Sequence, residues 1–157
     1  MPLTASIGRW GGGYVTDVPY LPGYYRHQSP VHLNIACLLG GFCGLDLAGT
    51  PLSCLELGCG RGFGALALAV CNPCWRVTGI DFNPAHIAAA RAFAAGIANI
   101  RFIEADFATL MDDRNACEIP EADVATLHGL WSRVADPVRH GIVRLLAARV
   151  RPGGGYR

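Results

Sequence analysis

Apolar and polar positions divide residues 30–150 into short apolar runs and longer apolar-rich stretches. The short runs are typical of buried strands, and we expect four of them, over residues 51–55, 76–80, 99–105 and 122–128. The longer stretches predict helices over residues 30–39, from 65 onward, over 84–95 and over 137–150. Each of the first two expected strands therefore leads through a turn into a helix.

The turn after the first expected strand carries the sequence Leu55-Glu56-Leu57-Gly58-Cys59-Gly60-Arg61-Gly62-Phe63-Gly64. Glycines let a backbone approach a ligand closely, and the start of the following helix offers free N–H groups. Together these features predict a nucleotide-binding element. The spacing of Gly60, Gly62 and Ala65 is compatible with a dinucleotide fingerprint. The pattern E-x-G-x-G-x-G, with Glu56 at the strand end before Gly58, favours a different cofactor.

Two aspartates follow later strands at the same edge of the expected sheet. Asp81 comes directly after residues 76–80, and Asp106 comes directly after residues 99–105. A carboxylate at Asp81 lies beside the glycine turn, where it can accept both hydroxyls of a ribose. The alternative is local, since Asp81 or Asn83 can cap a helix that begins at Pro84. Asp106 alone is equally compatible with a solvated loop.

Length and composition limit the kind of protein that is expected. At 157 residues with 52% hydrophobic and 16% charged residues, the chain forms one domain with a sizeable core. The net charge of +1, without a charge run, gives no sign of nucleic-acid binding, and no stretch is long and apolar enough to cross a membrane. All 13 basic residues are arginines, which suggests a GC-rich, bacterial genome.

The 7 cysteines form no pattern with an obvious function. Cys71 and Cys74 make a lone C-x-x-C at the end of a helix, and a zinc site would need a second pair of ligands. We therefore expect no metal. An odd number of cysteines without a signal peptide indicates reduced thiols and a cytoplasmic protein.

Residues 1–29 are rich in glycine, proline and aromatic side chains, which makes regular structure unlikely there. Disordered arms are usually poor in aromatic residues, whereas this segment has four tyrosines and a tryptophan. We expect it to fold over the ligand site as a lid, with Tyr24 or Tyr14 shielding the cofactor.

Four short motifs together resemble one family. Glu56-Leu57-Gly58-x-Gly60 resembles motif I of class I S-adenosylmethionine-dependent methyltransferases. Thr16-Asp17-Val18, Asp81-Phe82-Asn83-Pro84 and His128-Gly129-Leu130-Trp131-Ser132 resemble segments of bacterial methyltransferases that carry a C-terminal methyltransferase regulatory domain. Arg133 stands where those relatives have a second tryptophan.

This resemblance implies a Rossmann-like, three-layer α/β fold: a parallel sheet with helices on both faces, here truncated after about four strands. In the family order the strands would lie 3-2-1-4. Residues 30–157 would then form a cofactor-binding domain that is incomplete at its C-terminus, with the fourth strand as an exposed edge. Such an edge invites self-association.

The resemblance also implies roles for individual residues, with S-adenosylmethionine as the cofactor. The backbone of Gly58, Cys59, Gly60 and Gly62 would approach its methionyl end, and Glu56 would steer its ammonium group or the loop. Asp81 would hold the ribose and Asp106 the adenine amino group. Phe82 and Phe107 would lie against the adenine ring.

His128 follows the fourth expected strand and has two possible roles. Its side chain would act as a general base or orient the methyl acceptor, or only its backbone would contact the cofactor. The acceptor, a small molecule or a protein, is not identified. Two other functions stay open: a nicotinamide-dependent oxidoreductase of the same fold, and a non-catalytic half-domain that completes its sheet with a partner.

Overall fold

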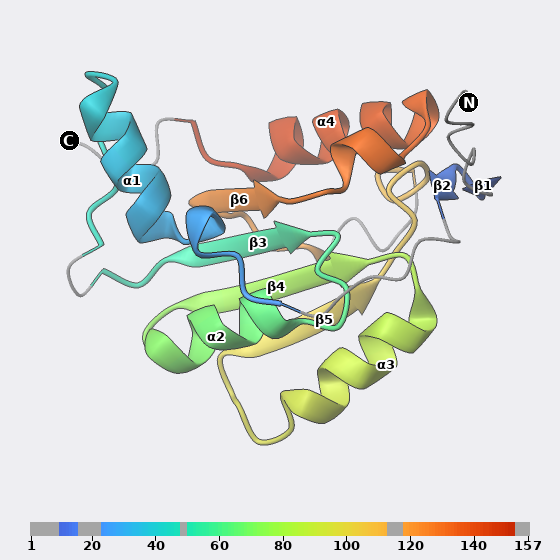
Figure 1. Cartoon of the computed structure of the whole chain (residues 1–157), viewed down its shortest axis with the longest axis horizontal. Coiled ribbons are helices and arrows are strands. Elements are labelled where there is room, and N and C mark those ends of the chain that lie inside the picture. Colours follow the sequence, from blue (N-terminus) through green and yellow to red (C-terminus); the bar gives the residue numbers. More distant parts are fainter. Residues whose placement is uncertain (1–9, 16–22, 48–49, 113–117, 153–157) are drawn as a thin grey trace, which may run out of the picture.

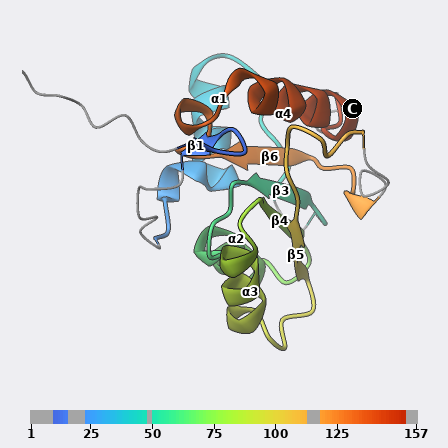
Figure 2. The ribbon, with the colours of Figure 1, turned by 90° about the vertical axis from the view of Figure 1, so that its right-hand side faces the viewer.

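The computed structural model describes residues 10–15, 23–47, 50–112 and 118–152. Its central sheet has four parallel strands in the order β5 (Ile100–Glu104), β4 (Arg76–Asp81), β3 (Ser53–Leu57) and β6 (Val124–Leu127). In chain order this is third, second, first, fourth, as the family resemblance implies. Helices lie on both faces of the sheet (Figures 1 and 2). The α/β, Rossmann-like prediction is therefore confirmed.

One face of the sheet is covered by α2 (Phe63–Cys71) and α3 (Pro84–Phe93), and the other by α4 (Asp136–Arg149) (Figure 1). Successive side chains of a strand point to opposite faces, so β3 contributes to two cores. Leu55 and Leu57 pack with Ile142 under α4, whereas Cys54 packs with the α2 and α3 side. The two apolar layers hold the carboxyl ends of the strands at a fixed edge.

Local signals explain where the helices next to this edge begin. Asn83 caps α3, because its side-chain oxygen accepts a hydrogen bond from the Ala85 backbone N–H at 2.9 Å, and Pro84 occupies the first helical turn. Ile87, Ala90 and Ala94 are buried on the sheet side of this helix, as its periodicity predicts. The predicted cap by Asn83 is thus present.

The fourth strand is shorter than the expected range of 122–128. Asp123 precedes the strand and contacts Ser53 twice: its backbone N–H donates to the Ser53 carbonyl oxygen at 2.8 Å, and its carboxylate accepts from the Ser53 N–H at 2.8 Å. Ala122 pairs instead with Val150, in a parallel bridge on the other side.

The N-terminal elements lie beside the sheet. β1 (Trp10–Gly11) and β2 (Tyr14–Val15) form a small antiparallel hairpin, followed by the 3₁₀ turn η1 (Arg26–Gln28) and by α1 (Pro30–Leu39). A second 3₁₀ turn, η3 (Trp131–Arg133), leads into α4. An isolated antiparallel bridge between Tyr14 and Val134 attaches the hairpin to the chain just before α4.

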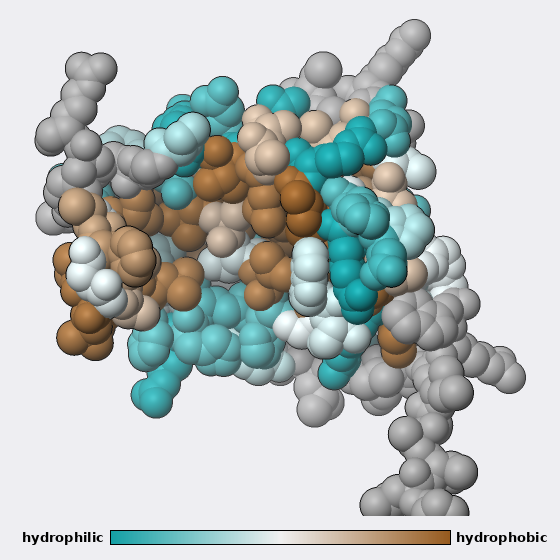
Figure 3. All heavy atoms as spheres, turned by 90° about the horizontal axis from the view of Figure 1, so that it is seen from above, coloured by the Kyte–Doolittle hydropathy of each residue, from teal (hydrophilic) through white to brown (hydrophobic). Residues whose placement is uncertain are grey.

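Apolar side chains gather where α1 lies when the molecule is seen from above (Figure 3). Several large apolar residues of this helix and the following loop are exposed: Val31, Leu33, Ile35, Leu38, Leu39 and Phe42. A hollow of about 510 Å³ separates α1 from β6, with Leu33 and Cys37 on one wall and Val124 and Ala125 on the other. This edge of the sheet is therefore apolar, as expected for the fourth strand.

Gly141 shows how closely α4 packs on the segment that follows β5. A Cβ at this position would overlap the carbonyl oxygen of Phe107. Gly141→Ala should therefore lower the free energy of unfolding by about 1–3 kcal/mol, as overpacked positions do. Replacing a glycine by alanine in an exposed helix has the opposite effect, because it raises the free energy of unfolding by about 1 kcal/mol. Chemical denaturation measures the difference, and a stabilised variant would show that α4 does not need this contact.

Candidate functional site

The glycine turn between β3 and α2 folds back onto the end of β4. Gly58, Gly60 and Gly62 have φ of 70°, 54° and 77°, a region that favours glycine. The backbone N–H groups of Gly58 and Cys59 donate hydrogen bonds to the Ile80 carbonyl oxygen, at 2.8 and 3.1 Å. The turn is thereby attached to the strand that supplies the first predicted aspartate.

Asp81 fixes the turn with its side chain as well. Its Oδ2 accepts a hydrogen bond from the Gly60 N–H at 2.8 Å, and its Oδ1 accepts one from the Asn83 N–H at 2.9 Å. His86 Nδ1 lies 3.3 Å from the same Oδ1. The residue is 5% exposed. Asp81 is thus a buried carboxylate in direct contact with the glycine turn, as its sequence position predicts.

Asp106 and Phe107 follow β5 at the same edge of the sheet. Asp106 is exposed, but its Oδ1 accepts hydrogen bonds from the Tyr14 hydroxyl at 2.8 Å and from the Ala108 N–H at 2.9 Å. Phe107 is fully buried, and the ring of Phe82 stacks on that of Tyr14 with centroids 3.8 Å apart. The loop is therefore anchored by the N-terminal hairpin.

These segments meet at one cavity of about 280 Å³ at the carboxyl edge of the sheet. Its lining includes five of the predicted site residues: Gly58, Asp81, Phe82, Phe107 and His128. Four of the predicted site residues belong to the same segments but lie outside its lining: Cys59, Gly60, Gly62 and Asp106. The lining also includes two arginines that the sequence analysis did not select, Arg61 from the glycine turn and Arg133 from η3. The cavity therefore joins carboxylate, guanidinium and aromatic groups from five separate segments, one of which is the N-terminal hairpin with Tyr14.

Glu56 lies deeper, beside a second and much smaller cavity of about 10 Å³. Tyr24 and Tyr25 of the N-terminal segment line this cavity with it. Glu56 Oε2 is buried and has no hydrogen-bond partner among the described residues. Burial raises the pKa of this carboxyl to about 7, although the Ala65 backbone N–H partly opposes the shift. Glu56 is thus a half-buried acid whose buried Oε2 has no partner among the described residues.

Gly64 makes room for this carboxylate. A Cβ at Gly64 would lie 2.6 Å from Glu56 Oε1, closer than side-chain atoms approach in proteins. Gly64 is therefore needed to leave space for the Glu56 carboxylate, and its backbone conformation does not itself require glycine.

His128 directly follows β6, and its ring lies against the N-terminal segment. Its Nδ1 lies 3.2 Å from His27 Nε2, and the ring of Tyr25 is 4.3 Å away between centroids. Partial burial lowers the pKa of His128, and His27 and Arg133 lower it further. The imidazole is therefore favoured in its neutral form, and it has a structural partner in His27. Both roles considered for His128 are compatible with this position.

His27, Arg61 and Arg133 show what the sequence did not reveal. His27 meets His128 only through tertiary structure, since the two residues are separated by 101 positions. Arg61 stands within the glycine motif, where its position was a usable signal. Arg133 was noticed only as a departure from the family pattern. Arg133 has no local pattern that distinguishes it from the other arginines of the chain.

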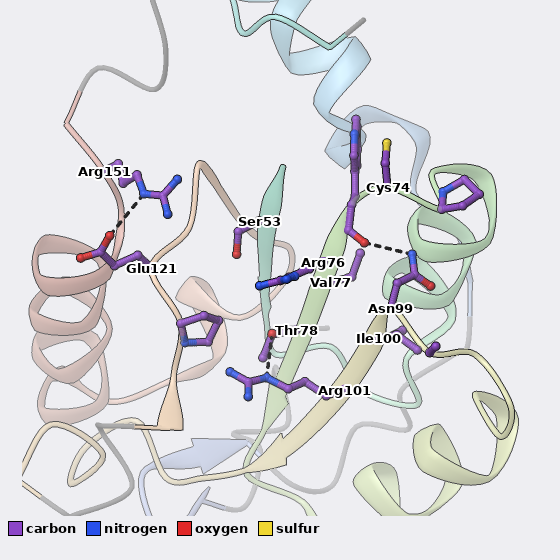
Figure 4. A pocket seen from close by; sticks show the side chains of 14 residues that line it. Ser53, Cys74, Arg76, Val77, Thr78, Asn99, Ile100, Arg101, Glu121 and Arg151 are labelled. Carbon is purple, nitrogen blue, oxygen red and sulfur yellow. Dashed lines mark hydrogen bonds and ion pairs between the residues drawn. The ribbon is translucent and has the colours of Figure 1, made fainter. Parts of the chain in front are cut away.

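A larger hollow of about 540 Å³ lies elsewhere, between α4 and the turn after α2 (Figure 4). Its lining includes Arg76, Arg101 and Arg151, and Arg101 Nε donates a hydrogen bond to Thr78 Oγ1 at 3.2 Å. Arg151 forms ion pairs with Glu121 and Asp123. This hollow contains none of the predicted site residues, so the smaller cavity at the carboxyl edge is the better candidate.

The described residues contain no cluster of three or more His, Cys, Asp or Glu side chains arranged to hold a metal ion. They also contain no helix with the length and apolar character needed to cross a bilayer.

Comparison with known proteins identifies the class. The family model for the methyltransferase domain matches residues 54–154. In the solved structure of PKMT2 from Rickettsia typhi in complex with AdoHcy, the matching part is 25% identical with a TM-score of 0.73. It covers 87% of this chain and 25% of that protein. The chain belongs to the methyltransferase domain family and has the class I, S-adenosylmethionine-dependent fold.

Two curated relatives add to this result. The uncharacterised protein sll1526 from Synechocystis is 34% identical over 147 residues, which are 92% of this chain and 28% of that protein. A tRNA1(Val) (adenine(37)-N6)-methyltransferase from Porphyromonas gingivalis is 48% identical over 59 residues, 37% of this chain and 23% of that enzyme. The chain thus spans about a quarter of the length of these relatives. The methyltransferase class is favoured over the oxidoreductase alternative.

The Glu56 carboxyl gives a test based on pH. The unfolded chain loses the Glu56 proton near 4.5, whereas the folded protein keeps it to about 7, so stability falls as pH rises through this interval. Glu56→Gln should remove this loss and raise the free energy of unfolding at pH 8, by on the order of 2 kcal/mol. Denaturation at pH 4.5 and pH 8 measures the effect. A variant with the same pH dependence as the wild type would show that Glu56 is already ionised.

Proposed function

We propose that this chain supplies the cofactor-binding half of an S-adenosylmethionine-dependent methyltransferase. The observation that carries the proposal is the convergence of a glycine turn, the buried Asp81 and the Asp106–Phe107 loop around one cavity. Glu56 lies behind the same turn. When bound, S-adenosylmethionine supplies an electrophilic methyl group on its sulfonium centre, so the protein contributes mainly positioning.

Asp81 would hold the ribose without releasing the glycine turn. Each carboxylate oxygen has two lone pairs, and Asp81 Oδ2 has one described partner, the Gly60 N–H. The remaining acceptor capacity is directed at the edge of the cavity that Asp81 lines. The same side chain thus connects the turn to the ligand.

The adenine would lie on the β4 and β5 side of the cavity. Asp106 would accept from its amino group, and the Phe107 N–H is a donor beside that carboxylate. Phe82 offers an aromatic face, and both phenylalanines line the cavity. This assignment agrees with the chemistry of the base, which presents a donor next to an acceptor on one edge.

The methionyl end would lie near the glycine turn and Glu56. A buried carboxylate oxygen without a partner is costly, and a cationic ammonium group would compensate it. Arg61 and Arg133 in the neighbouring cavity are cations that suit the cofactor carboxylate. Tyr24 lines the small cavity beside Glu56, which supports its inclusion among the cofactor-binding residues.

Other parts of the proposal rest on the sequence. The motifs around Thr16-Asp17-Val18 and His128-Gly129-Leu130 support membership of the bacterial group with a regulatory domain. The lid role of residues 1–29 is supported by the hairpin and by Tyr24 beside the site. The odd number of cysteines supports reduced thiols and a cytoplasmic location. The methyl acceptor is not defined by any residue of the site.

Calorimetric titration with S-adenosylhomocysteine, with NADH as the control ligand, tests the cofactor. The chain should bind the former and not the latter. Asp81→Asn should weaken S-adenosylhomocysteine at least tenfold, because hydrogen bonds to a charged group contribute about 1.5–3 kcal/mol.

Asp123→Asn is the matched control. It alters a largely buried carboxylate at the other end of the sheet, where Asp123 accepts from the Ser53 N–H. This variant should bind S-adenosylhomocysteine as the wild type does. Equal affinity of the folded Asp81 variant would contradict the ribose assignment, and preferential binding of NADH would contradict the methyltransferase proposal.

The apolar edge supports a second candidate property, self-association of the isolated chain. Ile35 and Leu38 on α1 are 52% and 57% exposed, and Leu33 and Cys37 of the same helix line the hollow along β6. Light scattering after size-exclusion chromatography should show a dimer that depends on protein concentration. Ile35→Glu with Leu38→Glu should abolish it.

Val143→Glu provides the control for this experiment. Val143 is 51% exposed on α4 and should leave the association unchanged. A wild-type chain that stays monomeric at high concentration would show that α1 does not bind a second copy.

A further inference from the structure

The hydroxyl group of Tyr14 makes two hydrogen bonds to the loop after β5. It donates to Asp106 Oδ1 at 2.8 Å and accepts from the Phe107 backbone N–H at 2.9 Å. Burial, reinforced by the Asp106 carboxylate, raises the pKa of Tyr14, so the hydroxyl keeps the proton that it donates. The two groups assigned to adenine recognition are thus both engaged by one side chain.

The ring of Tyr14 is placed like a bound base as well. It stacks on Phe82 with a centroid distance of 3.8 Å and an interplanar angle of 9°. Tyr14 is 2% exposed and is part of the lining of the 280 Å³ cavity. The Tyr14 ring thus lies nearly parallel to the Phe82 ring, and the Tyr14 hydroxyl contacts the Asp106 carboxylate and the Phe107 N–H.

Adenine has the same combination of features. Its amino group is a donor, the neighbouring ring nitrogen is an acceptor, and both lie on one edge of a flat ring. A tyrosine hydroxyl combines donor and acceptor in one group. We propose that Tyr14 imitates adenine and closes the adenine subsite, so that S-adenosylmethionine must displace this side chain to bind. The inference rests on the proposed function.

The hairpin that carries Tyr14 is suited to such a displacement. Its strands β1 and β2 have two residues each, and a two-stranded hairpin is barely stable by itself. Its described backbone and polar attachments are the Tyr14–Val134 bridge, the hydrogen bond from the Ala135 N–H to the Gly13 carbonyl at 2.8 Å and the Tyr14 hydroxyl, and the Tyr14 ring also packs in the core cluster with Val134 and Val138. Gly12 and Gly13, both at positive φ, form its turn.

When the cofactor displaces Tyr14, each group of the loop exchanges one partner for another. Asp106 and Phe107 pass from one donor–acceptor pair to another, and Phe82 passes from one ring to another, so none of them loses a partner. The hairpin, however, must give up its buried position. The apparent affinity for the cofactor is therefore the intrinsic affinity multiplied by the fraction of molecules in which Tyr14 leaves the subsite open.

Tyr14→Phe tests the inference, because it keeps the ring and removes both hydrogen bonds of the competitor. The closed form weakens while the cofactor contacts stay intact, so affinity for S-adenosylhomocysteine should rise about threefold to thirtyfold. The association rate constant should rise with it. Calorimetry and stopped-flow fluorescence measure the two quantities, and circular dichroism checks that the variant is folded.

Thr78→Val is the control for loss of a buried hydroxyl. Thr78 is 2% exposed, and its hydroxyl accepts from Arg101 Nε away from the site. The affinity of the Thr78→Val variant for S-adenosylhomocysteine should equal that of the wild type. Asp106→Asn should change the affinity less than Tyr14→Phe does, because Asp106 accepts a hydrogen bond from Tyr14 in the closed form and would accept one from the cofactor in the open form.

The possible outcomes separate the two proposals. Tighter binding by Tyr14→Phe, with Thr78→Val unchanged, supports adenine imitation. Equal or weaker binding by Tyr14→Phe, while the wild type binds, overturns it and shows that Tyr14 positions Asp106 for the cofactor. Failure of every folded variant and of the wild type to bind overturns the proposed function, and with it this inference.

Discussion

The carboxylate of Asp81 holds the site together. It comes directly from β4, yet it accepts the N–H of Gly60 from the turn after β3, and Ile80 next to it accepts the N–H groups of Gly58 and Cys59. A loop with three glycines at positive φ has little conformational preference of its own. Its shape is therefore set by these contacts with the neighbouring strand. The parallel register of β3 and β4 brings the two segments together, so the sheet, the turn and the carboxylate form one unit.

Much of this unit was predictable from the sequence because its signals are local. The strands are short apolar runs, Asn83 and Pro84 mark the start of α3, and the acids stand directly after strands. Parallel strands place their carboxyl ends at one edge, so the grouping of Glu56, Asp81 and Asp106 follows from the order of the elements. The strand order came from the family resemblance, because periodicity does not say which strands are neighbours.

What the sequence did not reveal depends on contacts between distant segments. Tyr14 was expected in a lid, but its two hydrogen bonds to the Asp106–Phe107 loop join positions more than 90 residues apart. His27 meets His128 across a similar separation. Glu56 was recognised as an acid at a strand end, whereas its raised pKa results from burial under α2 and the N-terminal segment. Burial of this kind is a property of the assembled layers, and no pattern in the local sequence encodes it.

The two ends of the site therefore differ in what a ligand would change. At the β5 end, Asp106 and Phe107 already have a partner in Tyr14, so a bound adenine would replace existing contacts and gain little net free energy. At the glycine turn, Glu56 Oε2 has no partner among the described residues, so an ammonium group there would relieve an existing cost. It follows that the methionyl end would supply most of the binding free energy. Adenine binding would displace Tyr14 and the hairpin that carries it. Cofactor binding would thus be coupled to the position of the hairpin.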